Sequence, residues 1–193
     1  MNLIIEIAIT IVCGIITMLV HEVPKSIVAF SVTHPIYRST QKINKNVLKY
    51  IDPLGLIMFV LLNVGWQKPY EYNSSKFRDK NKGILAIALT GIFANLLIMS
   101  ALLPMFNYIT LPIGQIFVGR LIYFNFSIVI MNLLPIPPLE MSKIIHSFSN
   151  NAYFKLVQNE RIIHTIFILL LVIGILSRFV DGIFRLIILP FIN

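Results

Sequence analysis

The sequence predicts an all-α polytopic membrane protein, and three observations support this. Of the 193 residues, 57% are hydrophobic and only 12% are charged, about half the charged fraction of a typical soluble domain. The mean hydropathy is +0.84, and a globule of this size cannot bury so much apolar side chain, so lipid must be the solvent for much of it. The apolar residues also form long runs between short polar loops. We expect one membrane domain over residues 1–193, with its core at about 3–145.

Four apolar runs are long enough to be expected as membrane-spanning helices. They are Leu3–Phe30, Ile84–Phe106, Gln115–Ile136 and Ile162–Leu176. A fifth run, Leu54–Val64, is too short to cross a hydrocarbon core of about 30 Å as a helix, so we expect a short re-entrant or hairpin segment there. The C-terminal hydrophobic region, about 162–192, closes with another short piece over Gly182–Ile192, expected as a half-span or an interfacial helix.

The net charge of +8 comes from basic residues in the loops between these runs. If Leu54–Val64 enters and leaves on one side, the three basic loops share one face, and the uncharged turn Asn107–Gly114 lies opposite. By the positive-inside tendency the basic face is cytoplasmic and the N-terminus is outside. We therefore expect contact with the lipid bilayer and no nucleic acid. The basic residues are Arg38, Lys42, Lys45, Lys49, Lys68, Lys76, Arg78, Lys80, Lys82, Lys143, Lys155 and Arg161.

Three ionisable residues, His21, Glu22 and Lys25, lie close together in the first apolar run. Each is costly in lipid unless it faces protein, water or an opposite charge. Positions 21 and 25 project from one helix face, which is the geometry two histidines use to hold zinc, with the intervening glutamate as general base. Lysine, however, has no free lone pair at neutral pH. The simpler expectation is that Lys25 stays protonated and pairs with Glu22 and Glu140, while Pro24 bends the helix.

A second polar group, Asn132 to Glu140, ends the third long run. Three prolines, at positions 135, 137 and 138, forbid a regular helix there. Non-helical backbone near membrane depth is tolerated only where protein buries it or water reaches it. The segment would deliver Glu140 into a pocket at the depth of His21. The alternative is an ordinary proline-terminated span with a surface glutamate.

Both groups together resemble the site-2 protease family of intramembrane zinc metalloproteases, in particular its compact bacterial members without a PDZ domain. The likeness covers roughly residues 15–145. Its four motifs, in family order, are His21-Glu22; Ile51-Asp52-Pro53-Leu54-Gly55 with Gly65-Trp66-Gln67-Lys68-Pro69 and Asn73; Gly91-Ile92-Phe93-Ala94-Asn95; and Asn132 to Glu140.

The resemblance implies a bacterial cytoplasmic-membrane protein that acts on transmembrane segments of regulatory proteins, with its active-site-like cavity near the cytoplasmic side. In family terms His21 and Glu140 would be metal ligands and Glu22 the catalytic base. Asn95 and Asn132 would bind the substrate or partner. The sequence departs from the family at Lys25, which stands in place of a histidine ligand. It also departs at Glu140, where the family has aspartate, and at Met141, where the family has glycine. Tyr50 stands where compact members often have histidine.

Three functions follow from these residues. The leading one is a pseudoprotease that binds transmembrane partners without cutting them, with Lys25 replacing the charge of the metal and no cofactor. The second is an active intramembrane metalloprotease, which would need zinc. The third is an ion relay through Glu6, Glu22, Lys25 and Glu140. The other histidines, His34, His146 and His164, are expected at the membrane interface rather than in the site.

Overall fold

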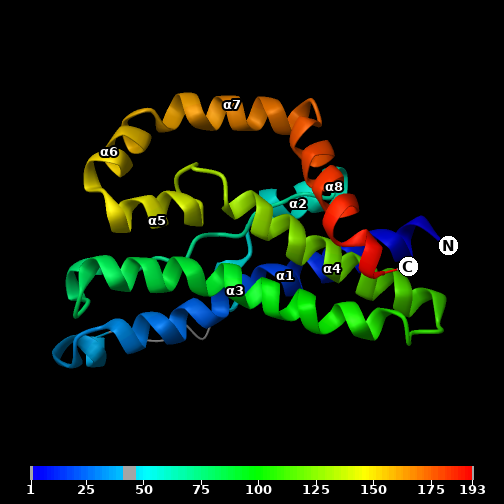
Figure 1. The fold of residues 1–193 in the computed structure, drawn as a ribbon, viewed down its shortest axis with the longest axis horizontal. Helices are drawn as coiled ribbons and strands as arrows, with labels where there is room; N and C mark the ends of the chain where they lie inside the picture. The colour runs from blue at the N-terminus through cyan, green and yellow to red at the C-terminus, as the bar shows by residue number, and fades with distance from the viewer. Residues whose placement is uncertain (1, 41–46, 193) are drawn as a thin grey trace.

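The computed structural model describes residues 2–40 and 47–192, so two lysines of the first basic loop, Lys42 and Lys45, lie outside the described residues. Within those ranges the regular elements are helices, apart from one isolated bridge between Thr33 and Phe77. Figure 1 shows the chain with its colour running from the N-terminus in blue to the C-terminus in red. The prediction of an all-α membrane protein is confirmed.

Among the described residues, three single helices are long and apolar enough to cross a membrane: α1 (Leu3–Val32), α3 (Lys80–Phe106) and α4 (Pro112–Asn132). Each corresponds to a predicted run, and capping residues set the ends. Asn2 caps α1 and Asp79 caps α3 by accepting a hydrogen bond from a first-turn N–H group. α4 begins at a proline, which costs no hydrogen bond there because the N–H of the first helical residue has no partner within the helix. It ends before the proline-rich segment.

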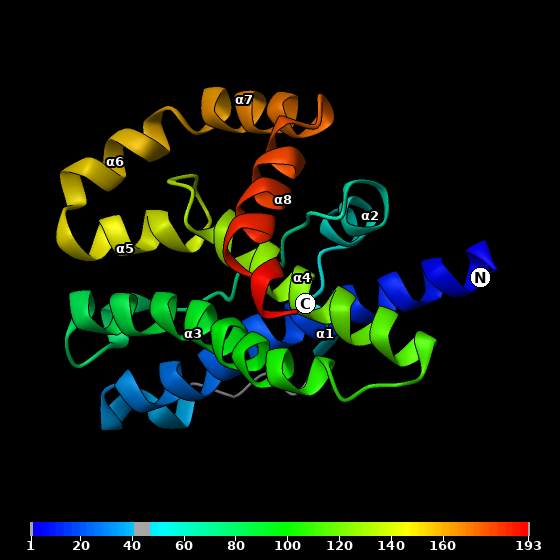
Figure 2. The ribbon, with the colours of Figure 1, turned by 45° about the vertical axis from the view of Figure 1, so that its right-hand side comes forward.

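α1, α3 and α4 pack side by side and enclose much of the core (Figures 1 and 2). Buried apolar side chains from α1 and α4, such as Met18 and Ile128, form one cluster with Phe59 of the short helix α2 (Pro53–Leu62). The rings of Phe59 and Phe124 lie 4.3 Å apart between their centroids.

The short apolar run is the 10-residue helix α2, followed by a return of the chain. Asp52 caps α2, and Asn63, in the left-handed conformation with φ 56°, ends it. The indole of Trp66 donates to Asp52 at 3.1 Å, and the N–H of Lys68 donates to the carbonyl of Tyr50 at 3.2 Å. The chain therefore comes back to where α2 begins, as expected for a hairpin segment.

The region between the third and fourth predicted spans, 137–161, contains two short helices, α5 (Glu140–Phe148) and α6 (Asn150–Gln158). The side chain of Ser149 caps α6 by accepting from the N–H of Ala152. Sequence polarity identified this region as lying outside the spans. It did not reveal the helices, because short amphipathic helices and loops have similar composition.

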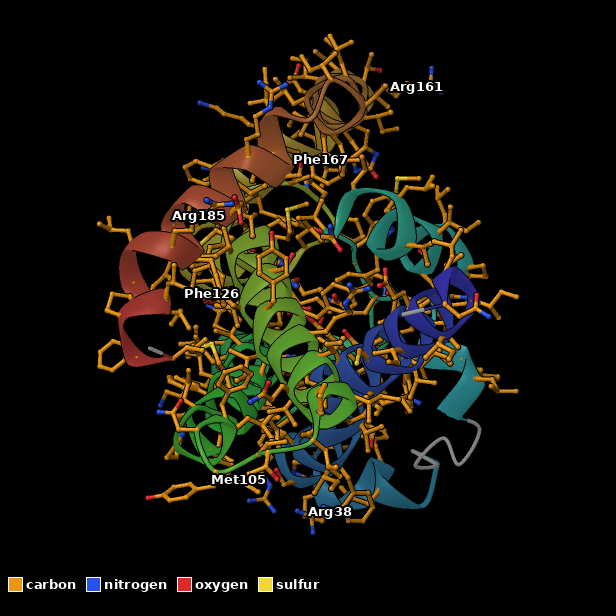
Figure 3. All side chains as sticks on the ribbon, turned by 90° about the vertical axis from the view of Figure 1, so that its right-hand side faces the viewer. Arg38, Met105, Phe126, Arg161, Phe167 and Arg185 are labelled. Atoms are coloured by element: carbon orange, nitrogen blue, oxygen red, sulfur yellow. The ribbon has the colours of Figure 1, made fainter. Side chains whose placement is uncertain are left out.

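The predicted span Ile162–Leu176 also needs correction. Helix α7 (Glu160–Val172) stops early, because Gly174 adopts the left-handed conformation with φ 75°, and α8 (Ile175–Ile187) leaves at 68° to α7. Helix α8 therefore starts well before the short piece expected at Gly182. Its buried face packs on α4: Phe126, labelled in Figure 3, lies 5.4 Å from Phe184 between ring centroids.

Candidate functional site

Helix α1 places the side chains of His21, Glu22 and Lys25 in the protein interior, and all three are fully buried. The helix continues through Pro24 as one element. Close contact with α3 is possible because residue 91 is glycine: a Cβ there would lie 2.5 Å from His21 Nε2. Gly91, part of the third motif, thus makes room for the side chains of His21 and Lys25.

The ammonium group of Lys25 lies between two buried carboxylates. Its Nζ donates to Glu22 Oε1 at 2.6 Å and to Glu140 Oε1 at 2.6 Å. Glu140 is the first residue of α5, directly after the proline-rich segment, and it is fully buried. The sequence predicted that Glu140 would reach the depth of His21 and pair with Lys25, and the contacts are as predicted.

A second lysine, which the sequence analysis did not place in the site, also contacts Glu140. Lys143 Nζ donates to Glu140 Oε1 at 2.9 Å, and its side chain is 12% exposed. Burial alone would raise the pKa of Glu140, but the positive charges of Lys25 and Lys143 outweigh burial and hold the pKa below its usual range. Two carboxylates are thus balanced by two ammonium groups. The spacing of Glu140 and Lys143, one helical turn apart, is the signal that could have identified the second cation.

His21 is oriented by an amide network from α3 and α4. Its Nδ1 lies 2.6 Å from Asn95 Oδ1, and since an amide oxygen only accepts, Nδ1 carries the proton. Asn95 Nδ2 in turn donates to Asn125 Oδ1 at 2.7 Å and to the carbonyl of Thr17 at 3.3 Å. Asn125 was not predicted, because an asparagine among apolar residues of a span carries no motif. The lone pair of His21 remains on Nε2, which lies 3.9 Å from both Glu22 Oε1 and Glu140 Oε1.

Asn132 connects the end of α4 to the two neighbouring non-helical segments. Its Oδ1 accepts from Gln67 Nε2 at 3.2 Å and from the backbone N–H of Glu140 at 3.3 Å. Its Nδ2 donates to the carbonyl of Ile128 at 2.9 Å. Asn132 therefore accepts from the backbone N–H of Glu140, just after the prolines, and fixes the start of the helix that carries Glu140. Asn95 and Asn132 are both fully buried.

The remaining candidate residues lie elsewhere. Glu6 is four helical turns before His21 on α1, roughly 22 Å along the axis. His34 is exposed, and His146 stacks on Tyr153 with ring centroids 4.2 Å apart. His164 Nε2 contacts the carbonyl oxygen of Pro137. None of these four joins the buried cluster among the described residues.

The donor atoms of His21, Glu22 and Glu140 lie within 4.8 Å of one another, which is close enough for a metal. Three buried atoms of these residues, His21 Nε2, Glu22 Oε2 and Glu140 Oε2, have no hydrogen-bond partner in the part of the chain that the structure describes. Yet Lys25 already binds one oxygen of each carboxylate. Its positive charge would repel a divalent cation held by the same carboxylates. Catalytic zinc normally takes three protein ligands. The residues therefore do not fit zinc while Lys25 is protonated.

The sequence is similar to one curated protein that is described as a protease. It is 25% identical over 142 residues to "Putative zinc metalloprotease YwhC" of Bacillus subtilis (strain 168), and the match covers 68% of this chain. The chain spans 64% of that relative's length, less than two thirds. No family model and no solved structure matches. The spans and this similarity together identify an integral membrane protein that resembles a zinc metalloprotease.

Proposed function

We propose that the protein is a non-cleaving relative of the site-2 proteases, which binds transmembrane segments of partner proteins in a bacterial cytoplasmic membrane. The observation that carries the proposal is the position of Lys25, whose ammonium lies 2.6 Å from both Glu22 and Glu140. An internal cation thus stands between the acids where a protease of this kind would need its metal. The four matching motifs and the similarity to a named metalloprotease support the relationship.

The balance of charges in the cluster supports a Lys25 side chain that stays protonated. Among the described residues, deprotonating Lys25 would leave Lys143 as the one ammonium within hydrogen-bond distance of the two buried carboxylates, and Lys143 contacts Glu140 but not Glu22. Breaking a buried ion pair by removing one partner costs about 3–5 kcal/mol. Zinc would have to overcome that cost before it could bind. We infer that the cluster stabilises the fold and shapes the membrane cavity instead of activating water.

An apolar cavity beside the cluster supports the binding of a transmembrane partner. It has a volume of about 350 Å³ and is walled by the proline-rich segment, the chain after α2, and α7. Trp66 and Phe167 form part of this wall, with ring centroids 5.9 Å apart. Gln67, which hydrogen-bonds Asn132, and Leu139, which precedes Glu140, connect the cavity to the cluster. Apolar side chains of a partner helix would suit these walls. Asn95 and Asn132 would then act by holding the cavity in shape.

A panel of membrane-anchored reporters, each with a different single transmembrane segment and a tag on both ends, tests the proposal. We expect one or more reporters to co-purify at full length, and expect Trp66→Ala to weaken that capture. Arg161→Ala, on the exposed start of α7, is the matched control. Production of cleaved reporter by the wild-type chain, but not by Glu22→Gln, would refute the proposal.

The second candidate is an active zinc metalloprotease, with Glu22 as base and His21 and Glu140 as ligands. The unpartnered His21 Nε2 and carboxylate oxygens favour it, as does the relative's name. It requires Lys25 to lose its proton or move away. The same reporter panel distinguishes the two functions, since only a protease yields cleavage that depends on Glu22.

A further inference from the structure

A second cavity lies at the other end of the bundle, far from the charge cluster. Its volume is about 600 Å³, and α4 and α8 provide most of its walls, with the ends of α2 and α3 completing them. Arg120, which lines it, is twelve residues before Asn132 on α4, or about 18 Å along the axis. Figure 3 shows the bundle from the end where α3 and α4 are joined, with α8 beside α4.

Two arginines line this cavity without a carboxylate partner. Arg120 donates to the hydroxyl of Thr10, and Arg178 donates to the carbonyl of Ile173 at 3.2 Å. Among the described residues, no carboxylate oxygen lies within 4.0 Å of either guanidinium. Each guanidinium has five N–H donors, so most of them remain available.

Arg120 is the more informative of the two, because it lies inside a predicted span. It follows Pro112 by eight residues, which puts it about 12 Å along the helix. A charged residue within a span is rare and marks a functional site by default. Among the described residues no carboxylate pairs with Arg120, which leaves its charge open to a bound anion.

Asp181, the one acid among the described residues that line the cavity, does not offset these charges. Its carboxylate accepts from Arg185 Nε at 2.9 Å, and both belong to α8 (Arg185 is labelled in Figure 3). The local balance is therefore two positive charges. The rest of the lining is mixed: apolar side chains such as Phe106, Ile116 and Phe124 lie beside polar ones such as Asn63, Gln115 and Ser177.

We propose that this cavity binds an anionic glycerophospholipid, with its phosphate between Arg120 and Arg178 and part of an acyl chain against the apolar wall. A guanidinium pairs well with phosphate because its planar donors fit two oxygens at once. The half-buried Arg120 within a span, the exposed Arg178 and the apolar side chains beside them together favour an amphipathic anion over a small free one. The site is independent of the charge cluster and of any proteolytic activity.

Binding is measured on the full chain in a zwitterionic detergent by titration with phosphatidylglycerol, and with phosphatidylcholine of the same acyl chains as the neutral comparison. We expect phosphatidylglycerol to bind at least about ten-fold more tightly, and expect Arg120→Gln/Arg178→Gln to remove at least about ten-fold of that affinity. Arg161→Gln, the exposed arginine labelled at the far end of α7 in Figure 3, should leave it unchanged.

Three results would overturn the proposal. One is equal affinity for the two lipids, and another is an unchanged affinity in the double variant. The third is competition by inorganic phosphate at the same concentration as the lipid, which would show a site for a free anion. Because Arg120 also contacts Thr10, the single variant Arg178→Gln, at an exposed position, is titrated as well. This variant should weaken the binding of phosphatidylglycerol several-fold and leave the binding of phosphatidylcholine unchanged. The thermal unfolding midpoint of the lipid-free protein should also stay unchanged.

Discussion

Replacing Lys25 by alanine tests whether the cluster is held together by charge. The substitution removes the ammonium that lies 2.6 Å from both carboxylates. Glu140 keeps Lys143 at 2.9 Å, whereas Glu22 loses its one charged lysine partner among the described residues. The structure therefore predicts that most of the cost arises at Glu22, a fully buried acid in a membrane span.

The expected magnitude follows from that geometry. Leaving one member of a buried pair without its partner costs about 3–5 kcal/mol. For a chain of this size each kcal/mol lowers the unfolding midpoint by about 2–4 °C, so Lys25→Ala should lower it by roughly 6–20 °C. The assay is thermal unfolding in detergent, followed by circular dichroism.

Two further variants make this result specific to charge. Lys82→Ala removes a lysine whose side chain is 86% exposed and 3.7 Å from Asp79, and it should leave the midpoint unchanged. Adding Glu22→Gln to Lys25→Ala should recover much of the lost stability, because it removes the unpaired charge. If Lys25→Ala unfolds at the same temperature as Lys82→Ala, or if Glu22→Gln brings no recovery, the pairing argument is wrong.

Three other outcomes are expected. Lys25→His, which restores an imidazole one helical turn from His21, should let the purified protein retain zinc that metal analysis detects; absence of zinc would mean that Pro24 or Glu140 spoils the geometry. Gly91→Ala should lower the unfolding midpoint, because its Cβ would meet His21 Nε2 at 2.5 Å, whereas Gly182→Ala, with nothing within 4 Å, should not. Stability should also fall on acidification below the usual glutamate pKa of about 4.3, because the folded state holds the pKa of Glu140 below that value and the stabilisation is lost as the pH approaches the folded pKa. Glu140→Gln should flatten that dependence, and an unchanged pH profile would contradict it.

Much of the fold was predictable because a helix that crosses a lipid bilayer needs a long, continuous run of apolar residues. The runs that became α1, α3 and α4 are long and apolar, and the short run that became α2 is too short to span. The break between α7 and α8 was not predicted. Hydrophobicity continues across it, and the left-handed conformation of Gly174 is a local backbone choice that an apolar run does not reveal.

The central residues of the candidate site were predictable from their spacing along a helix and from the free-energy cost of burying charged side chains in a membrane. His21 and Lys25 share a helix face, and buried charges must find partners, which led to Glu140 across more than a hundred residues. The supporting residues were harder to identify. Asn125 and Gln67 contribute through contacts between helices and loops, and such contacts depend on how the elements pack.

The central claim, that Lys25 takes the place of a metal, is tested most directly by metal analysis of the wild-type protein purified from zinc-replete cells. We expect no stoichiometric zinc, and the same result for His21→Ala. One equivalent of zinc per chain in the wild type, lost in His21→Ala, would contradict the claim and favour the protease.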